Sequence, residues 1–112
     1  MAMSQTASES KRLYLHQKLV DTTELERVYY NPLPTQKLVY PCIVYNDADE
    51  IARYADNGMY TRLLMWNVTI ISKNAVEASN LQDKILFSLD YAQKATTFIQ
   101  DNLYHKVLSI TL

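Results

Sequence analysis

Residues 60–72 have the sequence YTRLLMWNVTIIS, and the second half of this stretch alternates between apolar and polar side chains. The apolar positions are those of Leu64, Trp66, Val68 and Ile70. The polar positions between and after them are those of Asn67, Thr69 and Lys73. Alternate residues of a β-strand point to opposite faces of a sheet, so the pattern predicts a strand with one buried face. Trp66, in the middle of the apolar set, is expected in the core.

A helix is predicted after this strand, because apolar residues recur at helical spacing. They are Leu81, Ile85, Leu86 and Leu89. Ser79 with Gln82 three residues later is a candidate capping box, which predicts a helix start at Ser79 or Asn80. The polar residues of the first turns are expected to face solvent, and they are Gln82, Asp83 and Lys84. We therefore expect a one-sided helix of about three turns that packs on a sheet.

The last part of the chain predicts a β-hairpin. Residues 96–100 are rich in strand formers, and Asp101 and Asn102 supply a two-residue turn. Residues 104–112 again alternate, with Leu108 and Ile110 on one face, as expected for a partner strand with two unequal faces.

Two strands are predicted upstream. Residues 27–31 contain several strand formers and stop at prolines, which indicates a short edge strand. Residues 38–45 are a continuous apolar run, as expected of a strand buried on both faces. Pro41 cannot donate a ladder hydrogen bond, so it should mark the true start of this strand or a bulge. The secure part is residues 42–45.

Two segments complete the expected fold. Residues 9–20 mix apolar and basic residues in a pattern compatible with a helix capped by Ser8 or Ser10, although a strand over residues 13–19 also fits. Residues 46–59 are polar and lead to Gly58, which predicts a protruding hairpin loop. The resulting class is α+β, with a mainly antiparallel sheet of four to five strands and two helices on one face.

Size and composition suit one soluble domain. The chain has 112 residues, 48% of them hydrophobic and 21% charged, and a net charge of −1. We expect a flexible tail over residues 1–8 and a single domain over residues 9–112. The N-terminal residues lack the basic start and apolar run of a signal peptide, and no apolar stretch approaches the roughly 20 residues of a membrane span. We therefore expect a protein made in the cytoplasm.

Direct nucleic-acid binding is disfavoured, because Lys and Arg do not gather in a patch that could neutralise phosphates. Phosphate-cradling loops need several glycines close together, and Gly58 is the only glycine. Cys42 is the only cysteine, and its apolar neighbours indicate a buried thiol. His16 and His105 lie far apart in sequence, with His105 expected to cap or pack at the hairpin.

Asp47, Asp49 and Glu50 could be read as a divalent-ion cluster, but they lack calcium-loop spacing and are better explained as a solvated loop. No nucleophile with a positioned base is recognisable. The sequence therefore predicts a protein that is not an enzyme and has no cofactor or metal.

The chain contains nine tyrosines. Without accompanying Lys and Arg, base stacking is a weak explanation for them. Tyrosine also suits protein interfaces, because it combines a flat apolar ring with one hydroxyl. We favour an interface role, with plain core packing for several.

Several strand and turn motifs, spread over roughly residues 26 to 112, recur in one known family. They are residues 28–30, 40–45, 54–57 before Tyr60, 66–71, and Phe98 with residues 101–105. In these motifs the chain resembles small tail-completion or tail-terminator proteins of long-tailed bacteriophages. It departs from the family at residues 73–77, where a charged Asp-Pro-Asp-like segment is often found. That departure bears on loop contacts more than on the fold.

The resemblance implies a virion protein, assembled in the host cytoplasm, that forms a hexameric ring. Such a ring caps the finished tail tube and offers a surface to the head–tail connector proteins, while DNA only passes through the lumen. The interface residues expected from this are Asp47, Asp49, Glu50, Tyr54, Asp56, Asn57 and Tyr60. Acidic loops such as the first three could also line the lumen.

Alternative functions remain open at this point. A head-completion or neck connector protein stacked on the portal is also a small ring former, and sequence does not separate it from a tail terminator. A small non-viral protein-binding module, such as an antitoxin or inhibitor, would be a monomer with a tight partner. A small enzyme would need a convergent polar pocket.

Overall fold

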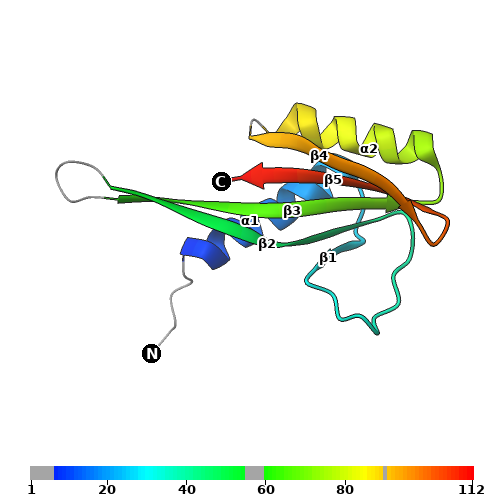
Figure 1. Cartoon of the computed structure of the whole chain (residues 1–112), viewed down its shortest axis with the longest axis horizontal. Coiled ribbons are helices and arrows are strands. Elements are labelled where there is room, and N and C mark those ends of the chain that lie inside the picture. The colour runs from blue at the N-terminus through cyan, green and yellow to red at the C-terminus, as the bar shows by residue number, and fades with distance from the viewer. Residues whose placement is uncertain (1–6, 55–59, 90) are drawn as a thin grey trace.

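The computed structural model describes residues 7–54, 60–89 and 91–112, and the side chains of residues 9–48, 64–89 and 91–112. Figure 1 shows two helices and one twisted sheet within these ranges. The elements are α1 (Ala7–Thr23), β1 (Val28–Tyr30), β2 (Cys42–Tyr54), β3 (Tyr60–Ser72), α2 (Ala75–Ser88), β4 (Ala92–Gln100) and β5 (Leu103–Thr111). The strand order is β1-β2-β3-β5-β4. The predicted α+β class is confirmed.

The sheet is antiparallel except at one edge. β2 with β3, β3 with β5, and β5 with β4 pair antiparallel, whereas β1 pairs parallel to β2 through Val28–Ile43, Tyr29–Val44 and Tyr30–Tyr45. β1 lies on an edge, as predicted. β2 begins directly after Pro41, so the prediction that this proline marks the strand's true start is also confirmed.

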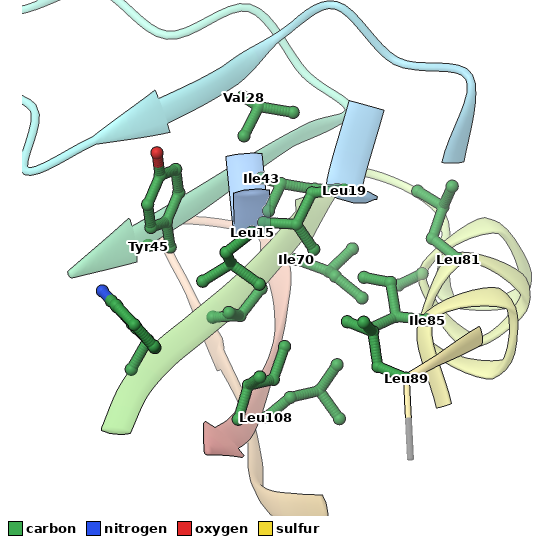
Figure 2. Packing of buried hydrophobic residues seen from close by; sticks show 14 of the residues in the cluster. Leu15, Leu19, Val28, Ile43, Tyr45, Ile70, Leu81, Ile85, Leu89 and Leu108 are labelled. Atoms are coloured by element: carbon green, nitrogen blue, oxygen red, sulfur yellow. The ribbon is translucent and has the colours of Figure 1, made fainter. Parts of the chain in front are cut away.

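Both helices cover the same face of the sheet and close one hydrophobic core. Leu15 and Leu19 of α1 pack in the same cluster as Ile85 of α2, and all three are fully buried. Figure 2 shows the labelled side chains of α1, α2 and the central strands converging on one space. The predicted buried face of β3 is confirmed, since its apolar set is at most 8% exposed, and these residues are Leu64, Trp66, Val68 and Ile70.

A smaller cluster lies on the opposite face of the sheet. It contains Cys42, Ile71 and Leu103, with Leu38 and other residues packed against it. The thiol of Cys42 is fully buried, and burial raises its pKa to about 11. The predicted burial of this thiol is confirmed, and with a raised pKa little of it would be ionised near neutral pH.

The hairpin at the end of the chain follows the prediction closely. Asp101 and Asn102 have φ angles of 54° and 62°, the left-handed conformation that a two-residue hairpin turn of this kind requires. β4 begins earlier than predicted, at Ala92. A bulge between Lys94 and Thr96 interrupts its pairing with β5.

The helix starts differ from the predictions. α1 begins at Ala7, so Ser8 and Ser10 lie inside the helix and are not its cap; the alternative strand over residues 13–19 is also wrong. α2 begins at Ala75, and the side-chain oxygen of Asn74 accepts hydrogen bonds from the backbone N–H groups of Val76 (2.8 Å) and Glu77 (3.1 Å). Neither described helix is long and apolar enough to cross a bilayer.

The predicted solvent face of α2 was wrong at one position. Ser79 and Asn80 lie within the helix, and the side chain of Gln82 is buried at 4% exposure. Gln82 is one helical turn on from Ala78, which is fully buried against the sheet, so it falls on the inward side. Asp83 and Lys84 are exposed, as predicted.

The predicted loop over residues 46–59 was wrong over most of its length. β2 continues through this polar stretch to Tyr54 and pairs with β3 as far as Tyr60. A register shift between Asp47 and Asp49 leaves Ala48 as the extra residue of a bulge. Residues 55–59 lie outside the described residues.

Candidate assembly surfaces

The β2–β3 hairpin extends beyond the body of the sheet. β1 accompanies β2 only as far as Tyr45, and β5 accompanies β3 only from Met65 onward, with a further backbone pair between Leu64 and Leu112. Residues 51–54 and 60–63 therefore form a two-stranded ladder with no described third strand. We call these residues the hairpin arm, and Figure 1 shows it projecting along the longest axis of the molecule.

The structure distributes the predicted interface residues along this hairpin. Asp47 lies opposite Trp66 at the root, and its side chain is exposed. Asp49 and Glu50 follow the bulge, at register positions opposite Met65 and Leu64. The predicted residues at the far end are Tyr54 and Tyr60, which pair with each other. Asp56 and Asn57 lie outside the described residues.

An aromatic cluster ties the root of the hairpin to α1 and β1. The rings of Tyr30 and Tyr45 have centroids 5.1 Å apart, and the guanidinium of Arg12 lies 4.7 Å from the centroid of the Tyr30 ring. The Tyr30 hydroxyl donates to the carboxylate of Asp47. The Tyr45 hydroxyl is 2.8 Å from Nδ1 of His16. We call these five residues the root cluster.

Tyr45 joins the root cluster to the core. Its side chain is fully buried, yet Figure 2 shows its hydroxyl directed away from the other labelled core residues. That hydroxyl also accepts a hydrogen bond from Nη1 of Arg12 at 3.5 Å. A buried tyrosine of this kind supplies a large apolar contact while its polar end remains bonded. The interface role favoured for tyrosines therefore does not hold for Tyr45, whose ring is core.

The environment of the root cluster shifts the pKa of three of its groups. Burial, and to a smaller extent the charge of Arg12, lowers the pKa of His16 below its usual value. The hydrogen bond to Asp47 is the main reason that the pKa of Tyr30 is raised, whereas burial is the main reason for Tyr45. At neutral pH both tyrosines are protonated and His16 is neutral, the state in which Nδ1 can accept from the Tyr45 hydroxyl.

The opposite edge of the sheet is open. Among the described strands, β4 pairs only with β5, and every one of its residues after Ala92 is exposed. Phe98 and Ile99 are 40% and 65% exposed, although they lie next to each other on a strand. Phe98 stacks on His105 with ring centroids 4.6 Å apart, which confirms the expected packing of His105 at this hairpin. An exposed strand edge with apolar side chains is a template for pairing with another chain.

A third surface is the outward side of α2. Phe87 is 91% exposed and Val76 is 68% exposed, and their separation of eleven residues places them on the same side of the helix. Tyr91, after the helix, is 69% exposed. Sequence reasoning passed over these residues, although the nearby solvent-facing Asp83 marked this side of the helix as outward.

The described side chains offer little of what a chemical site needs. Within the described ranges, no three His, Cys, Asp or Glu residues are grouped as metal ligands. The depression at the start of α2 is a wide, open one, lined by Asn74, Val76, Glu77, Asn80, Leu81 and Lys84. Of these, Asn74 is committed to capping the helix and Glu77 accepts a hydrogen bond from the Ser72 hydroxyl at 2.7 Å.

The sequence matches no protein-family model and no curated protein. The features available are an extended hairpin arm, an open β4 edge and the outward apolar side chains of α2.

Proposed function

We propose that this chain is a non-enzymatic structural subunit of a tailed bacteriophage, which self-associates into a ring that ends the tail tube and joins it to the head. The resemblance of residues 26 to 112 to tail-terminator proteins provides the family context. The geometry provides the physical support, because it suits repeated association of identical subunits.

The observation that carries this proposal is the placement of the open strand edges. β4 stands at one end of the strand order. At the other end, β1 pairs with β2 only as far as Tyr45, so the outer half of β2 has no described partner strand on that side. Two different surfaces on opposite sides of one subunit allow head-to-tail contacts, which close into rings when the rotation between subunits permits. Ring closure would also cover edges that otherwise invite uncontrolled pairing.

The hairpin arm provides a second contact in this proposal. It reaches beyond the body of the subunit, where an arm can lie against a neighbour or against the next ring. Its end carries Tyr54 and Tyr60, residues of a type enriched in protein interfaces. The acidic residues near its root, Asp47, Asp49 and Glu50, would suit a lumen that lets DNA pass without holding it.

The partners of the ring in this proposal are proteins. One rim binds the end of the tail tube and the other binds head–tail connector proteins, and the net charge of −1 suits such partners. The site of action would be the neck region of the virion, after assembly in the host cytoplasm. DNA would pass through the ring without being bound.

The direct test is negative-stain microscopy of the purified protein mixed with tail tubes and, separately, with connector particles. The proposal predicts density that caps one end of each tube. Density on connector particles alone would favour a neck protein stacked on the portal. Binding to neither particle, together with a monomeric native mass, would refute a virion ring altogether.

A variant sharpens the same experiment. Tyr54→Ala should weaken ring formation and tube capping while leaving the unfolding midpoint unchanged, because Tyr54 lies at the end of the arm, away from the core cluster. Tyr14→Ala is the matched control, since Tyr14 is 52% exposed on α1. If both variants lose rings equally, or if neither variant loses them, the result would argue against a contact through the arm.

A further inference from the structure

β4 is protected against strand pairing only at its start. Lys94 and the bulge between Lys94 and Thr96 are features that block or twist a strand edge. Residues 96–100 carry no charge and no proline, and they include the exposed Phe98 and Ile99. The second half of this edge is therefore open to a further strand.

A second open edge lies along the outer half of β2. Beyond Tyr45, described strand pairing reaches β2 only from β3, which leaves the β1 side of residues 46–54 without a partner strand in the part of the chain that the structure describes. The bulge at Ala48 interrupts this edge near its start, and its regular part, residues 49–54, is long enough to pair with the five open residues 96–100 of β4. The whole β2 edge holds three acidic residues and one basic residue, namely Asp47, Asp49, Glu50 and Arg53, whereas β4 holds Lys94 and no acidic residue.

We infer that β4 of one copy pairs with residues 46–54 of β2 of a second copy, so that the sheets of neighbouring subunits join. This inference rests on the proposed function, and it names the surface through which the ring would form. The occupant of the open β4 edge is thus a second copy of this chain. The observations that carry it are the two open edges, one on each side of the sheet, and the acidic character of the β2 edge beside a β4 strand whose one charge is that of Lys94.

Strand direction supports the pairing. β2 and β4 are separated by three antiparallel steps, through β3 and β5, so they run in opposite directions within one subunit. In a ring whose axis runs roughly along the strands, the rotation that relates neighbouring subunits preserves strand direction. β4 of one subunit therefore meets β2 of the next in the antiparallel arrangement, which is slightly more stable per residue than the parallel one.

The same pairing explains why each subunit needs two different edges. Because β4 and the outer half of β2 lie on opposite sides of the sheet, every subunit pairs through its β4 with one neighbour and through its β2 with the other. In this pairing each subunit is shifted along the strand direction relative to its neighbour. The shift arises because, within one subunit, β4 lies level with the inner half of β2, whereas it would pair with the outer half of the neighbour's β2. A closed ring absorbs such an offset by tilting its strands, as β-barrels do.

The test is disulfide trapping between engineered cysteines in the full chain. Ile99→Cys is combined in turn with Ala48→Cys, Glu50→Cys or Ala52→Cys, which samples successive registers on alternate residues of β2. Mild oxidation of at least one pair should give a ladder of covalent oligomers on a non-reducing denaturing gel, ending at the ring size. Native Cys42 is fully buried with a raised pKa, so it adds little background.

The outcomes separate the inference from the proposed function. A ladder for a pair, and not for its single variants, supports the inference even if the oligomers ignore tail tubes, in which case only the tail function fails. Rings that cap tubes but give no ladder with any pair would overturn the inference and leave the function standing. Dimers from Ile99→Cys alone would also overturn it, since they would indicate β4 pairing with β4.

A substitution at the edge provides independent evidence. Ile99→Lys should abolish oligomers by placing a charge on the paired edge, and Leu33→Lys is its matched control, because both native side chains are aliphatic and about two-thirds exposed, at 65% and 71%, and Leu33 lies outside the three candidate surfaces. Rings that survive Ile99→Lys, or that are lost equally in both variants, would contradict an interface at β4.

Discussion

The two edges of the sheet are held in opposite ways. At the β1 edge, a three-residue strand is fixed by the side chains of the root cluster, with Tyr30 bonded to Asp47 and Tyr45 bonded to His16. At the β4 edge, eight of nine residues are exposed. At the first edge, the molecule's own side chains hold β1 in place and contribute to stability. The second is left open, which suits a strand from another subunit.

The largest expected difference between the two edges is in stability. Tyr45→Ala should cost about 3–5 kcal/mol of unfolding free energy, because it removes a fully buried aromatic ring. Phe98→Ala should cost only about 0.5–1.5 kcal/mol, since Phe98 is 40% exposed and mainly loses its stacking on His105. Urea unfolding measures both. Similar losses would mean that the edges do not differ as described.

A smaller effect isolates the hydroxyl of Tyr45. Tyr45→Phe keeps the ring but leaves His16 without its 2.8 Å partner, so we expect a loss of about 1–2 kcal/mol. Tyr91→Phe is the control, because Tyr91 is 69% exposed, and it should change stability by less than about 0.5 kcal/mol. An unchanged midpoint for Tyr45→Phe would show that the root cluster contributes packing alone.

Acid should weaken both edges through their histidines. Burial lowers the pKa of His16 at the β1 edge and of His105 beside β4, so the folded state favours the neutral ring more than the unfolded state does. The resulting stability is present above the ordinary histidine pKa of 6.5 and is lost as the pH falls below it towards the folded-state value. The urea concentration at the unfolding midpoint should therefore decrease when the pH is lowered from 7.5 to 5.5. His16→Gln should reduce this fall, and a fall of unchanged size would exclude His16 as its source.

The smallest expected effect on stability is at the open edge. Ile99→Lys should change the unfolding free energy of the monomer by less than about 0.5 kcal/mol, because Ile99 is 65% exposed and outside the core cluster. Thermal or urea unfolding at low protein concentration measures it. A loss above about 1 kcal/mol would mean that Ile99 belongs to the fold and is not held ready for a partner.

Sequence reasoning succeeded where a strong local pattern faces the core. β3 was predicted with its observed bounds because alternate residues such as Trp66 and Val68 face one buried layer. The Asp101–Asn102 turn was predicted because few residue pairs accept two successive positive φ angles. These features depend on neighbours in sequence or on one simple period, which a single sequence displays directly.

The failures have a common physical origin, which is tertiary context that a single sequence does not display. Residues 46–54 are mostly polar, so no hydrophobic alternation identified the strand, and their pairing with β3 became visible only in the sheet. The start of α2 was misplaced because Ser79 and Gln82 have capping-box spacing, although Asn74 is the residue that caps. The parallel pairing of β1 depends on how residues 31–41 return to the sheet, which local pattern does not encode.

The candidate surfaces were predicted only in part. The hairpin was identified as protruding, but its strand character and the role of Asp47 in bonding Tyr30 required the structure. The open β4 edge was missed as a distinct surface, since its sequence looks like that of any hairpin strand. Its exposure follows from the strand order, in which nothing described lies beyond β4.

The most direct test of a ring-forming subunit is the native mass of the wild-type protein, measured by light scattering over a range of concentrations. We expect a single species at a fixed multiple of the 13.0 kDa subunit, seen as closed rings by negative-stain microscopy. A mass of 13.0 kDa at every concentration, with or without tail tubes, would contradict assembly through open sheet edges.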